Sequence, residues 1–314
     1  MFYKTIISGQ LEFGSAKSYE KVVRMCEQRV ENFYRTSELL LKVEDVFDEE
    51  THTLNIPRLV TQATDKGWQN TMKLLDYIIQ FAIAGDVRAW MVESGKVLKH
   101  KVIEPKSEKA AIQAYLRGRE LVEEEGKEKE AKAALSSAIA KYERHARAYE
   151  RRGYVNFLLQ NFEEAIQDYT KSISINPKNP EPYLGRGIIK MKQNDLEGAV
   201  ADMNMAIKHS IPLQPIHWKA RRIKGECLLR LEDFANSAKE LKFCTSRNYS
   251  REDSNYKWRQ LAWFNYGKAL AGAGQHTEAV QAFEQAIQIE DAAKQVPQEE
   301  LLEQKEQALQ LAEG

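Results

Sequence analysis

The sequence predicts two regions of different fold class, an α+β domain over residues 1–104 and an all-α solenoid over residues 105–314. Three observations lead to this prediction. Small and aromatic residues recur every 34 residues in the second region, and a fixed period of this length is typical of stacked helical repeats. No such period is found before about residue 108. The first region instead combines alternating apolar stretches, typical of strands, with two amphipathic helical stretches.

The first region has the order β-α-β-β-α-β-β. We expect two helices on one face of an antiparallel sheet, which is similar to the ferredoxin-like arrangement. The junction with the second region is expected at Pro105–Glu108, a polar segment that begins with proline. The expected strands are 2–13, 41–47, 51–60, 87–92 and 96–103, and the expected helices are 17–40 and 65–84.

Equivalent residues of the second region stand 34 positions apart: Tyr149 and Tyr183, Gly153 and Gly187, and Ala165 and Ala199. Glycine and alanine at these positions allow two helices to approach closely, because a larger side chain would push them apart. The period predicts five helical hairpins, the first of which needs one inserted residue in its glutamate-rich turn. The expected hairpins are 111–143, 146–179, 180–213, 218–250 and 260–292, followed by a capping helix over 297–312.

The order Tyr-x3-Gly, Ala-x3-Tyr and a closing proline resembles the tetratricopeptide repeat (TPR), a helix–turn–helix unit of 34 residues. The chain resembles a bacterial-type TPR protein with an additional N-terminal α+β domain. The resemblance implies a concave groove lined by the first helix of each repeat. Helical spacing places the following side chains there, on the side away from the glycine: Tyr115, Arg119, Arg147, Tyr154, Phe157, Leu184, Ile188, Met191, Lys219, Arg222, Phe264 and Lys268.

Some members of this family bind the C-terminal carboxylate of heat-shock chaperones with two asparagines and three basic residues. At the aligned positions this chain has Tyr115, Arg119 and Arg151, without the asparagine partners, and Asn265 stands alone. We therefore do not expect that specificity here.

Composition excludes several classes of protein. The chain has 46 basic and 46 acidic residues and is 43% hydrophobic, which excludes a disordered polyelectrolyte and bulk attraction to nucleic acid. Three scattered cysteines suit buried thiols better than disulfides or a zinc site. No catalytic or phosphate-binding motif is present, so neither catalysis, a cofactor nor a metal is expected.

A membrane segment is not expected either. The most apolar stretch, Leu74–Ala84, is about half the ~20 residues that a span needs. The first residues lack the basic and apolar regions of a signal peptide. These features predict a soluble cytoplasmic protein.

The sequence thus predicts a non-catalytic protein–protein interaction scaffold whose groove binds a peptide or helix of a partner protein. Two alternatives stay open. One is a regulatory or RNA-binding factor acting through the N-terminal sheet, although the aromatic RNA-recognition signature is absent. The other is an enzyme with a site at the domain junction. Nucleic acid and membrane partners are not expected, and no signal for a particular oligomeric state is present.

Overall fold

The computed structural model describes residues 1–35, 38–290 and 296–313. Its contacts divide the chain into two compact units, residues 1–178 and 179–314. The change of fold class near residue 104 lies inside the first unit. The boundary expected between residues 104 and 105 therefore stays a prediction.

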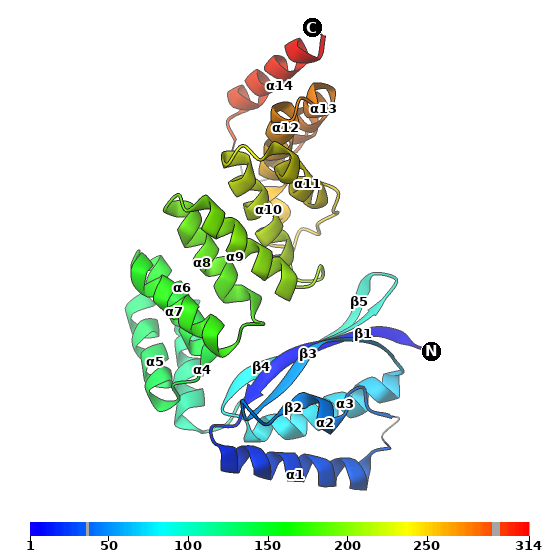
Figure 1. Cartoon of the computed structure of the whole chain (residues 1–314), viewed down its shortest axis with the longest axis vertical. Helices are drawn as coiled ribbons and strands as arrows, with labels where there is room; N and C mark the ends of the chain where they lie inside the picture. Colours follow the sequence, from blue (N-terminus) through cyan, green and yellow to red (C-terminus); the bar gives the residue numbers. More distant parts are fainter. Residues whose placement is uncertain (36–37, 291–295, 314) are drawn as a thin grey trace. The chain divides into compact units, whose positions relative to one another are not determined.

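The first unit begins with a five-stranded antiparallel sheet in the order β2-β3-β1-β4-β5. Without β5, this order is that of the ferredoxin-like arrangement, as predicted. Helices α1 and α3 pack on one face of the sheet (Figure 1). The bounds are β1 Tyr3–Glu12, α1 Ala16–Phe33, β2 Phe47–Asp48, β3 Thr53–Ala63, α3 Asp65–Ile78, β4 Ala84–Glu93 and β5 Lys96–Ile103.

Side-chain caps and alternating apolar residues position these elements. Ser15 and Thr64 cap α1 and α3 by accepting hydrogen bonds from backbone N–H groups three residues later, at 3.2 and 3.1 Å. Alternate residues of β1, Ile7 and Leu11, face the helices and are fully buried. They form a single core with apolar residues of α1 and α3, among which Leu74 is also fully buried.

Three predicted elements of this region are wrong in part. The helix expected over 65–84 ends at Ile78, a 3-10 turn follows over Ile79–Phe81, and Ala84 already begins β4. The expected strand 41–47 is mostly the short helix α2, Val43–Val46, and only Phe47–Asp48 pair as a strand. The spacing of the two buried valines in α2 is helical, which an alternating reading of apolar residues misses. The helix expected to reach residue 40 ends at Phe33, and residues 36 and 37 of that prediction lie outside the described part.

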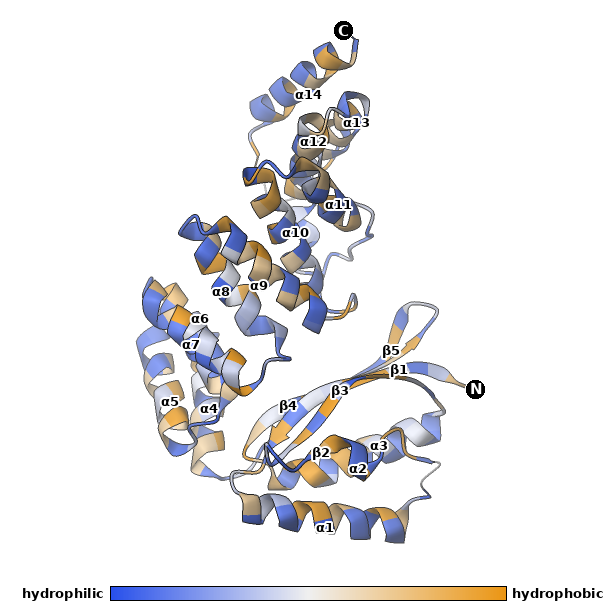
Figure 2. Ribbon diagram, viewed as in Figure 1, coloured by the Kyte–Doolittle hydropathy of each residue, from blue (hydrophilic) through white to orange (hydrophobic). Residues whose placement is uncertain are grey.

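Helical hairpins follow, as predicted. The first unit contains α4 Ala110–Val122, α5 Glu128–Lys141, α6 Ala146–Leu158 and α7 Phe162–Ile175. The second unit contains α8 Pro180–Lys192, α9 Leu196–His209, α10 Pro215–Arg230, α11 Phe234–Thr245, α12 Arg259–Gly272, α13 His276–Ile287 and α14 Gln298–Glu313. Each of the five pairs is one predicted repeat, and α14 is the predicted capping helix, packed on α13. Figure 2 shows that these helices mix hydrophobic and hydrophilic residues along their length, as amphipathic helices do.

The repeat glycines lie where the two helices of a hairpin touch. A Cβ atom at Gly187 would come within 2.6 Å of the methyl group of Met203, sixteen residues later on the second helix. In the first repeat the equivalent partner of Gly118 is Leu135, seventeen residues later. The extra residue in this repeat is the insertion that the sequence predicts for its glutamate-rich turn.

Ion pairs between the two helices repeat with the same spacing. Arg152 pairs with Asp168 and Arg186 with Asp202, in both cases with the two oxygens of a nearly buried carboxylate. Lys224 pairs with Glu240 in the fourth repeat at 2.7 Å. Each acid follows its base by sixteen residues, so these pairs join the first helix of a hairpin to the second.

Candidate functional site

Three of the predicted groove residues converge on one cavity in the first unit. Tyr115 and Arg119 on α4 and Arg147 on α6 line a cavity of about 260 Å³. The other walls come from β4, β5 and the segments beside them, so the cavity lies between the α+β domain and the first two repeats. We call it the junction pocket. Its lining is Ile83, Ala84, Gly85, Asp86, Arg88, Val102, Glu104, Pro105, Ile112, Tyr115, Arg119, His145, Arg147 and Arg151.

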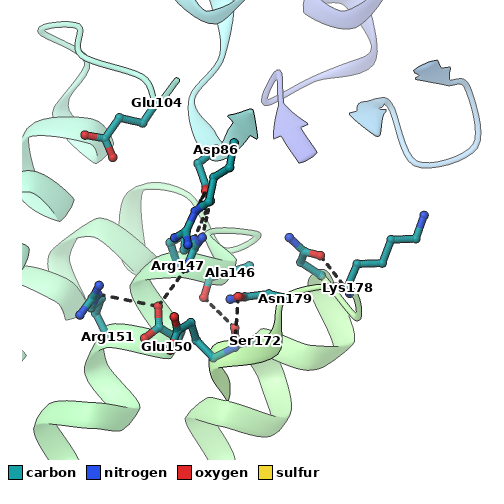
Figure 3. A network of polar contacts seen from close by, with 12 residues as sticks. Asp86, Glu104, Ala146, Arg147, Glu150, Arg151, Ser172, Lys178 and Asn179 are labelled. Atoms are coloured by element: carbon teal, nitrogen blue, oxygen red, sulfur yellow. Dashed lines mark hydrogen bonds and ion pairs between the residues drawn. The ribbon is translucent and has the colours of Figure 1, made fainter. Parts of the chain in front are cut away.

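A chain of charged groups runs through this pocket (Figure 3). Arg147 donates from Nε to Oδ1 of Asp86 at 2.7 Å, and Arg88 donates from Nε to Oδ2 of the same carboxylate at 3.0 Å. On its other side, Nη1 of Arg147 lies 3.5 Å from Glu150, which also lies 3.8 Å from Nε of Arg151. Figure 3 shows Arg147 between Asp86 and Glu150. Burial raises the pKa of Asp86, but the Arg147 and Arg88 charges outweigh it and hold that pKa below its usual value.

A second charged pair and two rings complete the pocket. Arg119 donates from Nη1 to Glu104 at 2.7 Å. The Tyr115 ring lies against His145, with 4.7 Å between the ring centroids. Burial raises the pKa of Tyr115, so its hydroxyl stays protonated at neutral pH. Burial also lowers the pKa of His145 to about 4, so the imidazole is neutral.

The buried imidazole predicts a loss of stability in mild acid. His145 caps α6, because its Nδ1 accepts a hydrogen bond from the Ala148 N–H at 3.2 Å. Its pKa is 6.5 when unperturbed and about 4 in the folded chain. The unfolded chain therefore binds the proton more readily than the folded chain. The neutral His145 stabilises the fold above pH 6.5, and this stabilisation is lost as the pH falls toward 4. His145→Asn keeps a capping oxygen but does not titrate. Between pH 6.5 and 4, we expect its free energy of unfolding to fall by about 2–3 kcal/mol less than that of the wild type.

Urea unfolding of both proteins at several pH values across that interval measures the difference. Other groups, such as the buried Glu12, titrate in both proteins and cancel in the comparison. Equal pH dependence of the two proteins would contradict a buried neutral His145.

Farther along α6, aromatic and apolar side chains are exposed. Tyr154 is 39% exposed and Leu158 41% exposed. Phe157 is half-buried, with its ring centroid 6.0 Å from that of Phe162. Tyr154, Phe157 and Leu158 follow at helical i, i+3 and i+4 spacing, and we call them the α6 patch. Tyr154 and Leu158 continue the line of Arg147 and Arg151 along one side of the helix.

The predicted groove residues of the second unit differ in exposure. Ile188, Met191, Lys219 and Lys268 are half-buried. Phe264 is only 4% exposed and packs on Phe283, with 5.9 Å between ring centroids, so it belongs to the core rather than to an open groove.

Leu184 and Arg222 are also buried. The Arg222 guanidinium lies 4.3 Å from the Trp258 ring centroid and 3.9 Å from Glu226. Spacing from the glycine predicts the side of the first helix on which these side chains lie. It does not show whether that side is an open groove or a contact with a neighbouring element.

The sheet face opposite the helices carries Trp90. Its side chain is 5% exposed and stacks on His100, with 5.1 Å between the ring centroids. A base cannot stack on this ring without displacing its neighbours, so the geometry does not favour the RNA-binding alternative. Within the described ranges, no group of three histidine, cysteine or acidic residues could hold a metal ion. All three cysteines are buried.

Four polar residues of the junction pocket were missed in the sequence analysis: Asp86, Arg88, Glu104 and His145. Arg151 was named at an aligned position but was not included among the groove residues. Helical spacing could have found Arg151, which follows Arg147 by four residues. The residues before position 105 have no comparable signal, since only the docking of the α+β domain brings them to the repeats.

Comparisons with known proteins agree with this architecture. Models of the tetratricopeptide repeat match residues 146–179, 184–242 and 260–293. The fold therefore defines a protein built of helical-hairpin repeats. The chain is a tetratricopeptide repeat protein with an N-terminal α+β domain.

Curated relatives match a limited segment. The chain is 35% identical over 97 residues to the Protein SGT1 homolog of Oryza sativa subsp. japonica, covering 30% of this chain and 25% of the relative. It is 28% identical over 94 residues to a FAM10 family protein of Arabidopsis thaliana, covering 30% of this chain and 20% of that protein. The matched segment thus spans a quarter or less of these relatives.

Solved structures share the fold at low sequence identity. YrrB, described as a TPR protein with an unusual peptide-binding site, matches with a TM-score of 0.50 and 19% identity over 62% of this chain and 92% of its own. PilF of Pseudomonas aeruginosa matches with a TM-score of 0.51 and 15% identity over 65% of this chain and 85% of its own. Among the helices of the described part of the chain, none combines the length and apolar character that a bilayer-spanning segment requires.

Proposed function

We propose that this protein is a non-catalytic protein–protein interaction scaffold, in which the first helices of the repeats bind a peptide or helix of a partner around the α6 patch. The observation that carries the proposal is the exposure of Tyr154 and Leu158 on the first helix of a repeat. Stacked repeats form extended binding surfaces, and clustered exposed apolar side chains usually mark an interaction site.

The two ends of α6 suit different roles. Arg147, in its first turn, is held by Asp86 of the α+β domain, and α6 packs against β4. The last two turns carry the α6 patch, which offers a peptide an aromatic ring and an aliphatic side chain. Aromatic residues in such a position commonly dominate binding energy. The peptide-binding site described for YrrB supports this class of ligand, although the likeness itself concerns only the fold.

The proposed surface can be tested first by crosslinking. A photoreactive phenylalanine analogue in place of Tyr154, in the full chain, should crosslink to one segment of a partner in extracts of the source cells. The same analogue at Phe243, an exposed aromatic residue on the second helix of the fourth repeat, is the matched control. The crosslinked segment identifies the peptide for quantitative measurements.

We expect Tyr154→Ala combined with Leu158→Ala to weaken binding of that peptide by about thirtyfold or more, since loss of a buried aromatic anchor commonly costs about 2 kcal/mol. Fluorescence anisotropy with the labelled peptide measures this loss. Both side chains are substantially exposed, so the melting temperature should change by only a few degrees. Phe243→Ala should bind as the wild type does. Unchanged affinity in the double variant would contradict the α6 patch as the binding surface.

A further inference from the structure

We infer that the junction pocket binds a small organic or inorganic oxyanion, a molecule of metabolite size that carries a carboxylate or phosphate group. This inference goes beyond the proposed peptide surface and does not depend on it. The pocket is walled by the α+β domain as well as by the repeats, so it is a feature of this chain's domain combination.

The first argument is charge. Four guanidinium groups surround the cavity, those of Arg88, Arg119, Arg147 and Arg151. The facing carboxylates are Asp86 and Glu104 in the lining and Glu150 beside Arg147. Arg88 and Arg119 each pair with one carboxylate, Asp86 and Glu104, and about a third of each arginine side chain is open to solvent. Four guanidinium groups that converge on one small cavity attract a ligand of opposite charge.

The second argument is hydrogen-bonding capacity. A guanidinium has five N–H donors, so a carboxylate that accepts from one nitrogen leaves the other donors of that guanidinium available to a ligand. Arg119 uses only Nη1 for Glu104, and Arg88 uses only Nε for Asp86. In the described part of the chain, the remaining nitrogens of these two side chains have no hydrogen-bond acceptor. A ligand that only accepts hydrogen bonds, as a carboxylate or phosphate does, matches this surplus.

The third argument is size and the character of the walls. The cavity of about 260 Å³ lies just below the usual range for drug-sized ligands, roughly 300–1,000 Å³. Ile83, Val102 and Ile112 line it beside the arginines and give a short carbon skeleton an apolar contact. The site therefore fits a small molecule with one or two anionic groups.

The test is a titration of the full chain with sodium succinate, citrate, phosphate and pyrophosphate, with ionic strength held constant by sodium chloride. Isothermal calorimetry and the melting temperature are the two measurements. We expect saturable binding and a rise in melting temperature with at least one of these anions. Binding of succinate or citrate would indicate a carboxylate ligand, and binding of phosphate or pyrophosphate would indicate a phosphate ligand. No saturable binding by any of them up to about 10 mM would overturn the proposal.

Variants of opposite expected sign make the test specific to the pocket. Arg88→Gln with Arg119→Gln removes two cationic donors and should weaken binding about tenfold or more. Glu104→Gln removes a competing carboxylate and should strengthen binding several-fold, a gain that mere damage to the fold would not produce. Arg117→Gln, two residues from Arg119 but outside the pocket and exposed, should bind as the wild type does. Wild-type affinity in the double arginine variant, or weaker binding in Glu104→Gln, would overturn the proposal.

Discussion

Replacing Gly85 with alanine is expected to lower the free energy of unfolding by about 3–5 kcal/mol, because backbone strain and a steric clash act together. Gly85 has a φ of +97°, which side-chain-bearing residues rarely adopt. A Cβ atom there would lie 2.0 Å from the carbonyl oxygen of Gln10 and 3.0 Å from the Cα of Leu11. Both atoms belong to the backbone of β1, so the clash can be relieved only by separating two paired strands.

Gly95 provides the matched control. It lies in the turn between β4 and β5 with a φ of +81°, and no neighbouring atom lies within 4 Å of an added Cβ. Gly95→Ala should therefore show the conformational cost alone, about 1–2 kcal/mol. Urea unfolding of the three proteins compares the two effects. An equal loss in both variants would mean that β1 and β4 separate without cost, in contradiction to their close pairing.

The Gly85 variant also concerns the candidate site. Gly85 directly precedes Asp86, the carboxylate that Arg147 and Arg88 share. Displacement of β4 should therefore loosen the junction pocket, and Gly85→Ala should bind a pocket ligand more weakly than Gly95→Ala. This connects the backbone geometry of the sheet to the chemistry of the repeats.

The repeats could be predicted from the sequence because their core depends on local spacing. A glycine on the first helix and a large residue sixteen positions later on the second meet within one hairpin, as Gly187 and Met203 do. Such contacts are set by one turn, so a fixed period in the sequence reports them directly. The single insertion in the first repeat was visible for the same reason.

The α+β domain was predictable in its order of elements but less so in detail. The strand predicted over 41–47 is wrong because two valines at helical spacing in so short a stretch resemble a strand. Phe264, predicted in the groove, is buried for a related reason. Its helical phase is right for the groove, but its packing on Phe283 depends on how neighbouring helices stack.

The candidate site shows the same limit. Tyr115, Arg119 and Arg147 could be placed on one surface, because helical phase within each repeat fixes their side. Their partners could not be predicted. Asp86 and Arg147 lie 61 residues apart and meet only because the domain docks on the repeats. A long-range pairing of this kind has no periodic signal in a single sequence.

The largest effect expected within the repeats comes from Asp202. Its carboxylate accepts from Nε and Nη2 of Arg186 at 3.0 and 2.7 Å, and Nζ of Lys190 lies 2.9 Å away. Asp202→Ala removes the acceptor shared by both cations in a place that is almost inaccessible to water. Breaking a buried pair typically costs 3–5 kcal/mol. We expect about 3 kcal/mol, the lower end of that range, because Arg186 and Lys190 keep part of their access to solvent.

Glu197→Ala is the control for this prediction, since it removes an exposed acid from the same helix, α9. Its unfolding free energy should stay within about 0.5 kcal/mol of the wild type. Replacing the pair together, with Asp202→Leu and Arg186→Met, should restore part of the loss, because no uncompensated Arg186 charge is then left beside an apolar contact. Urea denaturation of the four proteins decides the outcome. If Asp202→Ala is as stable as Glu197→Ala, the ion pairs that join the helices of each hairpin contribute little, and glycine packing alone must hold the two helices together.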